Sequence, residues 1–281
     1  MIVVTGGTGQ LGTEFRRLLG DRAVYPGRDR LDLARPETVF GAVLELRPTL
    51  VINCAAYTAV DAAETDAATA ARVNGDSVGQ LARACAETGA GFVTFSTDYV
   101  FDGTKAAPYV ESDPPAPINR YGATKLEGEE LALTHHPGAL VVRTSWVLSG
   151  THPNFAATML RLVAARPVDV VDDQRGHPTL VADLAPAVLD AVEAGATGIV
   201  HLTNAGVVTW FELARAVTEI AGLDPERVRP CRTEDFPRPA PRPRNSVLES
   251  ERLARLRIPA MPHFRPSLER AVRSLVAAFG P

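Results

Sequence analysis

Short apolar runs alternate with amphipathic segments along the first half of the chain. The apolar runs are rich in β-branched residues and cover residues 2–5, 23–25, 50–53, 91–95 and 140–143. Apolar positions recur with helical spacing in the segments between them, residues 11–19, 36–46, 67–87 and 121–133. Continuous apolar strands that alternate with helices are typical of a parallel sheet covered on both faces. The pattern therefore predicts a doubly wound α/β sheet.

The regular alternation of apolar runs and amphipathic segments changes after about residue 146. Helices are predicted at residues 154–165, 182–194, 210–221 and 266–279, and strands at 168–171 and 199–202. A proline-rich stretch, residues 236–244, precedes the last helix. We expect two domains, at residues 1–148 and 149–281, the second smaller and mixed in its elements. The strand at 199–202 could return to the main sheet.

A glycine-rich turn joins the first strand to the first helix, with the sequence Gly6-Gly7-Thr8-Gly9-Gln10-Leu11-Gly12. Glycine allows the tight turn, lets the backbone approach a pyrophosphate and brings the helix close to the strand. The free N–H groups of the helix N-terminus then attract the phosphates. The turn predicts a Rossmann-type dinucleotide site, formed by Gly6, Gly9, Gln10, Leu11 and Gly12.

The residues after the second strand indicate which dinucleotide binds. Arg28 stands where NAD-binding proteins usually carry an acidic residue for the ribose hydroxyl, and an arginine there suits the 2′-phosphate of NADPH. The neighbouring Asp29 leaves NADH open. Asp32 and Leu33 could receive the adenine edge, although a turn that leads into the next helix explains them equally well.

The third strand also ends in residues that suit a cofactor. Small side chains at Ala55 and Ala56, just before Tyr57, would let a dinucleotide lie against the backbone. We therefore include these three residues in the predicted cofactor site.

Tyr121 and Lys125 stand four residues apart on a predicted helix, so their side chains share one face. A nearby ammonium favours the phenolate form of tyrosine and should lower its pKa. Of the 29 basic residues only Lys105 and Lys125 are lysine, and all the others are arginine, which does not usefully give up a proton. The pair predicts acid–base chemistry; the alternative is a lysine on an exposed helix face.

Hydroxyl groups follow the fourth strand, at the edge where open α/β sheets place their sites. Ser96 and Thr97 precede Asp98 there, and either hydroxyl could bind a carbonyl oxygen beside the Tyr121 phenol. Such residues more often form a turn or a helix cap when they occur alone. Together with Tyr121 and Lys125 they predict a site for carbonyl reduction.

These motifs give the chain a resemblance to the extended short-chain dehydrogenases/reductases, and within them to the dTDP-4-dehydrorhamnose reductase family. The resemblance runs essentially end to end. It is carried by residues 5–12, 55–61, 96–103, 121–125, 143–146, 154–155, 173–174 with 178–179, and 242–246. It implies reduction by NAD(P)H of the 4-keto group of a dTDP-6-deoxyhexulose, so a dTDP-sugar is the expected substrate.

The resemblance also implies roles for individual residues. Thr97, Tyr121 and Lys125 would be catalytic. Tyr121 would protonate the forming alkoxide while Thr97 holds the oxygen. Lys125 would lower the phenol pKa and bind the nicotinamide ribose.

The resemblance further implies a pocket for the sugar and the nucleotide that contains Val60, Asp98 and Trp146. Arg242 and Arg244, within the proline-rich stretch, are candidates for the pyrophosphate because guanidinium groups bind phosphate bidentately. Solvated arginines on a linker are the alternative.

The sequence Thr97-Asp98-Tyr99 bears on the type of reaction. Nucleotide-sugar dehydratases of the same superfamily carry Thr-Asp-Glu here, and this chain lacks the second acid. We therefore expect a reductase, while an epimerase would need the same tyrosine and lysine. Two alternatives stay open: a 4-ketoreductase for another dTDP-deoxysugar of a natural-product pathway, and a non-catalytic nucleotide-binding regulatory subunit of the same fold.

Composition limits the classes of partner that we expect for this chain. A formal net charge of −4 over 281 residues gives no reason to expect nucleic acid or an anionic membrane as partner. The three cysteines are too scattered for a disulfide framework or a zinc site, and we expect no metal. We see neither a signal peptide nor a membrane span, and so expect a cytoplasmic enzyme. The resemblance also implies dimers held by a metal in some relatives; residues 176–183 carry a single acid here, which argues against that mode, and a homodimer stays open.

Overall fold

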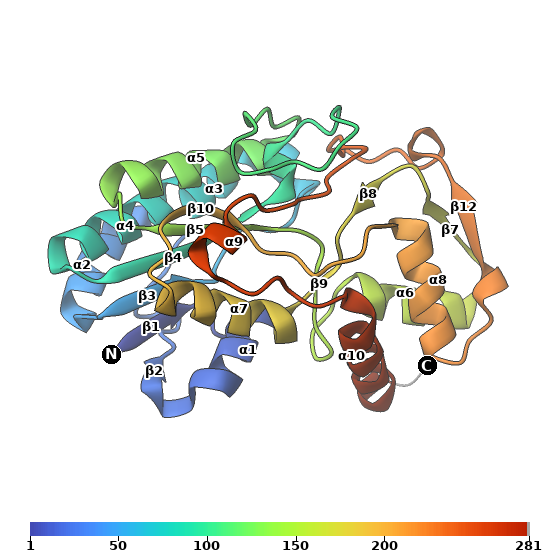
Figure 1. Ribbon diagram of the computed structural model, residues 1–281, viewed down its shortest axis with the longest axis horizontal. Helices are drawn as coiled ribbons and strands as arrows, with labels where there is room; N and C mark the ends of the chain where they lie inside the picture. Colours follow the sequence, from blue (N-terminus) through green and yellow to red (C-terminus); the bar gives the residue numbers. More distant parts are fainter. Residues whose placement is uncertain (280–281) are drawn as a thin grey trace.

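A six-stranded parallel sheet organises the larger of two lobes (Figure 1). The computed structural model describes residues 1–279. The strand order is β10-β5-β4-β3-β1-β2, and every neighbouring pair is parallel. The strands are β1 (Ile2–Thr5), β2 (Ala23–Val24), β3 (Leu50–Asn53), β4 (Gly91–Thr97), β5 (Leu140–Thr144) and β10 (Gly198–His201). The predicted doubly wound sheet is confirmed, and its strand order reverses between β1 and β3, where such sheets open a ligand crevice.

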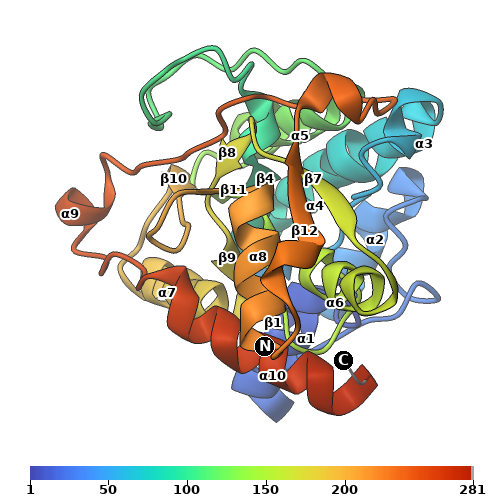
Figure 2. The ribbon, with the colours of Figure 1, turned by 90° about the vertical axis from the view of Figure 1, so that its right-hand side faces the viewer.

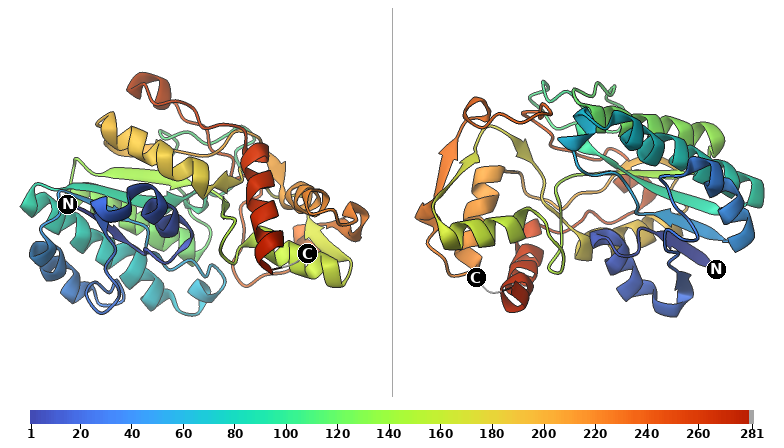
Figure 3. Two further views of the ribbon diagram at one scale, coloured as in Figure 1. Left: turned by 90° about the horizontal axis from the view of Figure 1, so that it is seen from below. Right: turned by 180° about the vertical axis from the view of Figure 1, so that it is seen from behind.

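Helices cover both faces of this sheet. On one face lie α2 (Pro36–Leu46), α4 (Ser77–Thr88) and α5 (Arg120–His135), and on the other α1 (Gln10–Leu19) and α7 (Val181–Glu193) (Figures 1 and 3). Successive strand residues point to opposite faces, so Val3 packs into the first helical layer and Val4 into the second. Two buried faces explain why the strands read as unbroken apolar runs.

The helix predicted at residues 67–87 differs from the observed one in its middle. The structure has α3 (Ala67–Ala71), a π-helical turn at Arg72–Asp76 and then α4. The turn directs the buried Asn74 side chain at the loop after β3, where its Oδ1 accepts from Tyr57 N (2.9 Å) and its Nδ2 donates to Tyr57 O (3.0 Å). A sequence period cannot show such a single-turn bulge, which frequently marks a functional site.

The second lobe gathers α6 (Phe155–Ala165), α8 (Trp210–Ile220) and α10 (Phe264–Phe279) around the paired strands β7 (Val168–Val171) and β12 (Val228–Cys231) (Figure 2). Two shorter pairs join it to the sheet lobe: β6 (Val147–Leu148) with β9 (Thr179–Leu180), and β8 (Arg175–Gly176) with β11 (Val208–Thr209). The chain then returns across the sheet lobe to the short α9 (Leu253–Leu256) (Figure 1). Thus α7, β10 and α9, all beyond residue 148, pack on the sheet.

Within residues 1–279, none of the helices combines the length and the apolar character needed to cross a membrane.

Candidate active site

The glycine-rich turn packs so closely that two of its glycines have no room for a side chain. Gly6 has a φ of +63°, and a Cβ there would lie 2.7 Å from the backbone nitrogen of Ala55. A Cβ on Gly12 would lie 2.1 Å from the carbonyl oxygen of Gly6. Gly9 precedes α1 as its N-cap and provides no side-chain cap, so the first N–H groups of the helix, at Gln10 and Leu11, remain available. This cradle fits the pyrophosphate of a dinucleotide.

The other residues of the predicted cofactor site lie at the ends of the neighbouring strands. Arg28 is exposed in the loop after β2. Asp32 accepts a hydrogen bond from Ala34 N (3.0 Å), so its side chain forms a turn, and the buried Leu33 accepts from the Ser77 hydroxyl through its carbonyl (2.6 Å). Ala55, Ala56 and Tyr57, which follow β3, are each half-buried.

Thr97, Tyr121 and Lys125 come together from two elements, the end of β4 and the first turns of α5. Thr97 is buried, donates to Asp98 Oδ1 (2.9 Å) and shares a hydrogen bond with the Tyr121 phenol. Tyr121 and Lys125 follow one another on a single face of α5, whose N-terminus is capped by Asn119 accepting from Gly122 N (2.7 Å). Gly122 lets this turn approach β4, since a Cβ there would lie 2.1 Å from the Tyr99 carbonyl oxygen.

The protonation states of these groups differ from the expectation. Burial, together with the negative charge of Asp98, raises the pKa of Tyr121 to about 12, while hydrogen bonding with Thr97 opposes the shift. The net shift is therefore upward rather than downward as expected, because desolvation of the phenol, which favours the neutral form, exceeds the lowering contributions. A phenol that keeps its proton at neutral pH is the form required of a proton donor.

Lys125 is itself buried, with only 5% of its surface exposed. Burial lowers its pKa to about 8, and the Glu129 carboxylate opposes this shift. Glu129 lies one turn further along α5 and receives two hydrogen bonds from Arg143 of β5, at 2.9 and 2.7 Å. The buried ion pair thus places a negative charge near the Lys125 ammonium and helps to keep it protonated.

The pH dependence of the unfolding free energy tests the electrostatic environment of Asp98. Burial raises the pKa of Asp98 from 3.8 to about 6, although hydrogen bonds from Ser246 and Thr97 oppose the shift. The folded state therefore binds this proton more tightly than the unfolded state, and the stability gained is lost as pH rises through about 6. Relative to wild type, we expect Asp98→Asn to gain up to about 3 kcal/mol in unfolding free energy between pH 4 and 7.5, on the order of two pKa units.

Urea unfolding of the two proteins at both pH values measures this difference. Asp76→Asn, which removes an exposed carboxylate from the π-helical turn, serves as the control and should show no such gain. Equal pH dependence in wild type and Asp98→Asn would contradict the burial of a charged Asp98.

The predicted substrate residues surround the same strand ends. Val60 is half-buried after β3, and Trp146 is half-buried after β5. Arg242 bonds to the carboxylate of Asp61 and to the carbonyl of Ala240. Its guanidinium also lies against the buried phenol of Tyr99, the neighbour of Asp98. Arg244 is exposed on the same loop, and its carbonyl accepts from Arg175 N (2.8 Å).

Sequence reasoning missed the residues that hold the proline-rich loop over the site. Asp61 binds Arg238 as well as Arg242 and accepts from Ala240 N (3.2 Å), and these arginines hold its pKa at about 2. Asn119, besides capping α5, donates to Pro241 O (2.9 Å). The motif around residue 61 was the only available signal, because the partners lie about 180 residues apart. The loop is therefore a fixed wall of the site rather than a free linker.

Lys105 is partly exposed and forms an ion pair. Its ammonium pairs with Asp113, and its backbone N–H donates to the Tyr109 hydroxyl (3.1 Å). The loop it belongs to packs on the proline-rich loop, since Asn245 donates to the carbonyl of Lys105 (2.7 Å).

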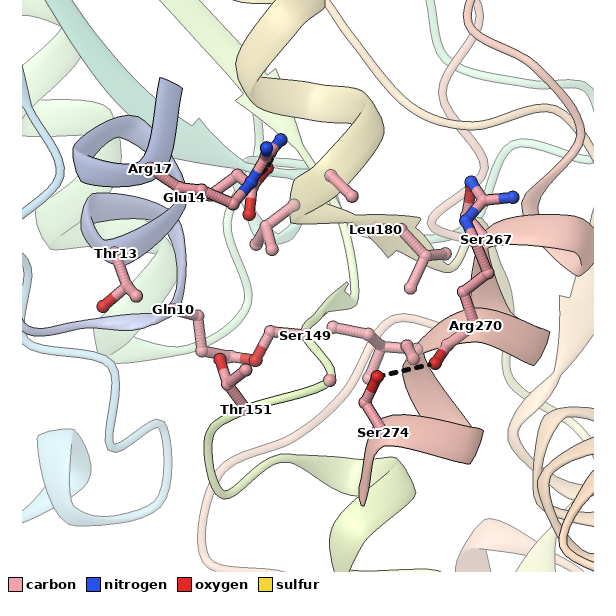
Figure 4. A pocket seen from close by; sticks show the side chains of 15 residues that line it. Gln10, Thr13, Glu14, Arg17, Ser149, Thr151, Leu180, Ser267, Arg270 and Ser274 are labelled. Atoms are coloured by element: carbon pink, nitrogen blue, oxygen red, sulfur yellow. Dashed lines mark hydrogen bonds and ion pairs between the residues drawn. The ribbon is translucent and has the colours of Figure 1, made fainter. Parts of the chain in front are cut away.

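A cavity of about 320 Å³ lies between α1 and α10 (Figure 4), and its wall contains none of Thr97, Tyr121 and Lys125. Gln10, Thr13 and Arg17 of α1 face Ser267, Arg270 and Ser274 of α10 across it. Gln10 is the only predicted site residue in its wall. Across residues 1–279, we find no group of three or more His, Cys, Asp or Glu side chains that could hold a metal ion.

Comparison with known proteins gives consistent results. The family model described as "RmlD substrate binding domain" matches residues 1–277. The chain is 45% identical to the dTDP-4-dehydrorhamnose reductase of Mycobacterium tuberculosis, over 96% of this chain and 92% of that protein. It is 42% identical to a probable dTDP-4,6-dihydroxy-2-methyloxan-3-one 4-ketoreductase of Streptomyces antibioticus, over 99% of this chain and 97% of that protein.

Solved structures agree with the sequence matches. A dTDP-4-dehydrorhamnose reductase from Clostridium acetobutylicum superposes with a TM-score of 0.93 at 36% identity, covering 98% of this chain and 99% of that chain. The reductase from Bacillus anthracis, solved in complex with NADP, superposes with a TM-score of 0.90 at 36% identity, covering 96% and 97%. The chain belongs to the RmlD family, the family of the dTDP-4-dehydrorhamnose reductases.

Proposed function

We propose that the chain reduces the 4-keto group of dTDP-4-dehydrorhamnose to give dTDP-L-rhamnose, with NADPH as the reductant. The observation that carries this proposal is the meeting of Thr97, Tyr121 and Lys125 at the carboxyl ends of the sheet, beside the glycine cradle. Family membership at 42–45% identity over nearly the whole chain supports it.

NADPH, when bound, supplies the hydride. The chain would hold its pyrophosphate with the N–H groups of Gln10 and Leu11, which Gly6 and Gly12 bring within reach. We assign the 2′-phosphate to the exposed Arg28 after β2, because an arginine at this position can pair with that group. Ala55 and Ala56 then leave the edge of β3 open toward Lys125, whose ammonium would bind the ribose hydroxyls.

Tyr121, Thr97 and Lys125 have separate roles at the sugar carbonyl. Tyr121, neutral because its pKa is raised to about 12, donates its proton to the C4 oxygen as negative charge develops there. The Thr97 hydroxyl, already in contact with the phenol, positions that oxygen. The Lys125 ammonium stabilises the phenolate that remains, since an adjacent positive charge favours the ionised form.

The sugar nucleotide would lie between the two lobes. We assign cofactor binding to residues 1–148 and the diphosphate contacts of the sugar nucleotide to residues 149–281, whereas Val60, Thr97, Asp98, Tyr121 and Trp146 contribute substrate contacts from the first segment. We assign the diphosphate to Arg242 and the exposed Arg244 of the proline-rich loop, because guanidinium groups bind phosphate bidentately, and Asp61 bonds to the first of them.

The decrease of NADPH absorbance on mixing enzyme, NADPH and dTDP-4-dehydrorhamnose tests the proposal. We expect oxidation that depends on the keto sugar and yields dTDP-L-rhamnose. A chain that binds NADPH but does not oxidise it under these conditions would contradict this proposal and leave two alternatives, a nucleotide-binding regulatory subunit and a 4-ketoreductase for another dTDP-deoxysugar.

A second candidate is a 4-ketoreductase for another dTDP-deoxysugar. The Streptomyces antibioticus relative, named as a probable 4-ketoreductase, favours it at 42% identity. Parallel assays with dTDP-4-keto-6-deoxy-D-glucose, followed by NMR of the product at C4, separate the two activities.

A further inference from the structure

Trp146 has a backbone conformation that its position does not explain. Three non-glycine residues among 1–279 have a positive φ: Arg47, Arg257 and Trp146, the last at +45°. The two arginines end α2 and α9 as left-handed caps. Trp146 instead lies between β5 and β6, where no helix ends. Such a conformation in a bulky residue persists only where its surroundings hold it, and it is often associated with function.

One constraint on Trp146 is an aromatic stack. Its ring lies on that of Trp210, the first residue of α8, with the centroids 3.6 Å apart and the planes 10° from parallel. The ring of Phe155 packs against Trp210 in turn, with centroids 4.5 Å apart. Trp210 is held by a capping box, in which the Thr209 hydroxyl accepts from Glu212 N (3.1 Å) and Thr209 N donates to the Glu212 carboxylate (2.7 Å).

A second constraint comes from Gly176 in β8. A Cβ on Gly176 would lie 2.5 Å from Cε2 of Trp146, so the indole occupies the space that any other residue would fill. Gly176 pairs with Val208 in the β8–β11 ladder, two residues before Trp210. The residue that makes room for the indole and the ring that stacks on it therefore belong to one unit.

Trp146 follows β5, the strand that pairs with the end of β4. Thr144, two residues before Trp146, pairs in register with Thr97. The indole Nε1 is buried and has no hydrogen-bond partner among the described residues, and the ring as a whole is half-buried. An indole held in this way presents a rigid apolar surface at small entropic cost, which suits the C–H face of a sugar.

We propose that Trp210 and Gly176 are positioning residues that set the plane of Trp146 against the hexose of the substrate. The inference rests on the proposed function, because it takes a dTDP-deoxyhexose as the ligand. Neither residue touches the reacting atoms in this scheme. They determine how tightly the hexose is bound, while proton donation stays with Tyr121.

Tryptophan fluorescence can test this proposal directly, since the only two tryptophans of the chain, Trp146 and Trp210, form the stack. In wild type we expect dTDP-L-rhamnose to change the tryptophan emission beyond any change caused by dTDP alone. Identical emission with the two ligands would overturn the proposal without any variant.

Three variants give a second test through kinetics. Trp210→Leu removes the stack and Gly176→Ala pushes on the indole, whereas Trp210→Phe keeps an aromatic ring. We expect the first two to raise KM for the keto sugar about tenfold, with kcat changed less than about threefold and the affinity for NADPH unchanged. Trp210→Phe should keep KM for the keto sugar close to the wild-type value.

Phe211→Leu is the matched control, because it removes a neighbouring ring of α8 that packs on the same core but is not part of the stack. A merely structural role predicts that KM, kcat and NADPH affinity deteriorate together, in proportion to the lost melting temperature and equally in the control. That result would overturn the proposal. If wild type does not turn over the keto sugar, the proposed function fails, and the emission comparison still decides whether the stack senses a hexose.

Discussion

Tyr121→Phe should lower kcat for the keto sugar by about 10³-fold, because it removes the proton that the phenol donates to the C4 oxygen. Thr97 already shares a hydrogen bond with the phenol and donates to Asp98, so it is held as an orienting group. Steady-state rates measure the loss, and NADPH titration by fluorescence should show unchanged affinity.

Tyr109→Phe is the matched control for this change. It also removes a buried phenol, but its hydroxyl donates to Asp102 (2.7 Å) in a loop away from Thr97. We expect a small loss of stability and a nearly normal kcat. A Tyr121→Phe enzyme that retained more than about a tenth of the wild-type rate would show that the proton comes from another group.

Lys125→Arg should lower kcat/KM by at least about 100-fold although it preserves the charge. Lys125 is buried, and the space lined by Asn74, Ser96 and Gly128 beside it is too small for a water molecule. A planar guanidinium does not fit there without displacing α5. The measurement is kcat/KM together with circular dichroism, which should show that the variant remains folded.

Lys105→Arg uses the other lysine of the chain as its control. Lys105 is partly exposed and pairs with Asp113, an interaction that arginine can preserve. We expect normal turnover. Equal effects of the two substitutions would mean that the single lysine on α5 reflects the arginine-rich composition and not the chemistry.

The sheet and the shared helix face of Tyr121 and Lys125 were predictable because both follow from short spacings in the sequence. Strands buried on both faces give apolar runs, and a separation of four residues places Tyr121 and Lys125 on one helix face. By contrast, β8 and β11 are two residues each and exist only because distant segments meet. No local pattern marks such pairs.

The environment of the site was less predictable than its members. The link from Asp61 to Arg242 joins residues 181 positions apart, and the contact of Ser246 with Asp98 joins residues 148 positions apart. Burial then reverses the expected direction of the Tyr121 pKa, because the desolvation of a phenol depends on what packs around it. Spacing can identify a catalytic group, but its protonation state requires the fold.

The most direct test of the proposed reductase is the fate of the hydride. With NADPH carrying deuterium at both C4 positions of the nicotinamide, wild type and dTDP-4-dehydrorhamnose should give dTDP-L-rhamnose with one deuterium at C4 of the hexose, visible by NMR as loss of the C4 proton signal. A product with a full C4 proton signal, or recovery of unchanged keto sugar, would contradict direct reduction at this site.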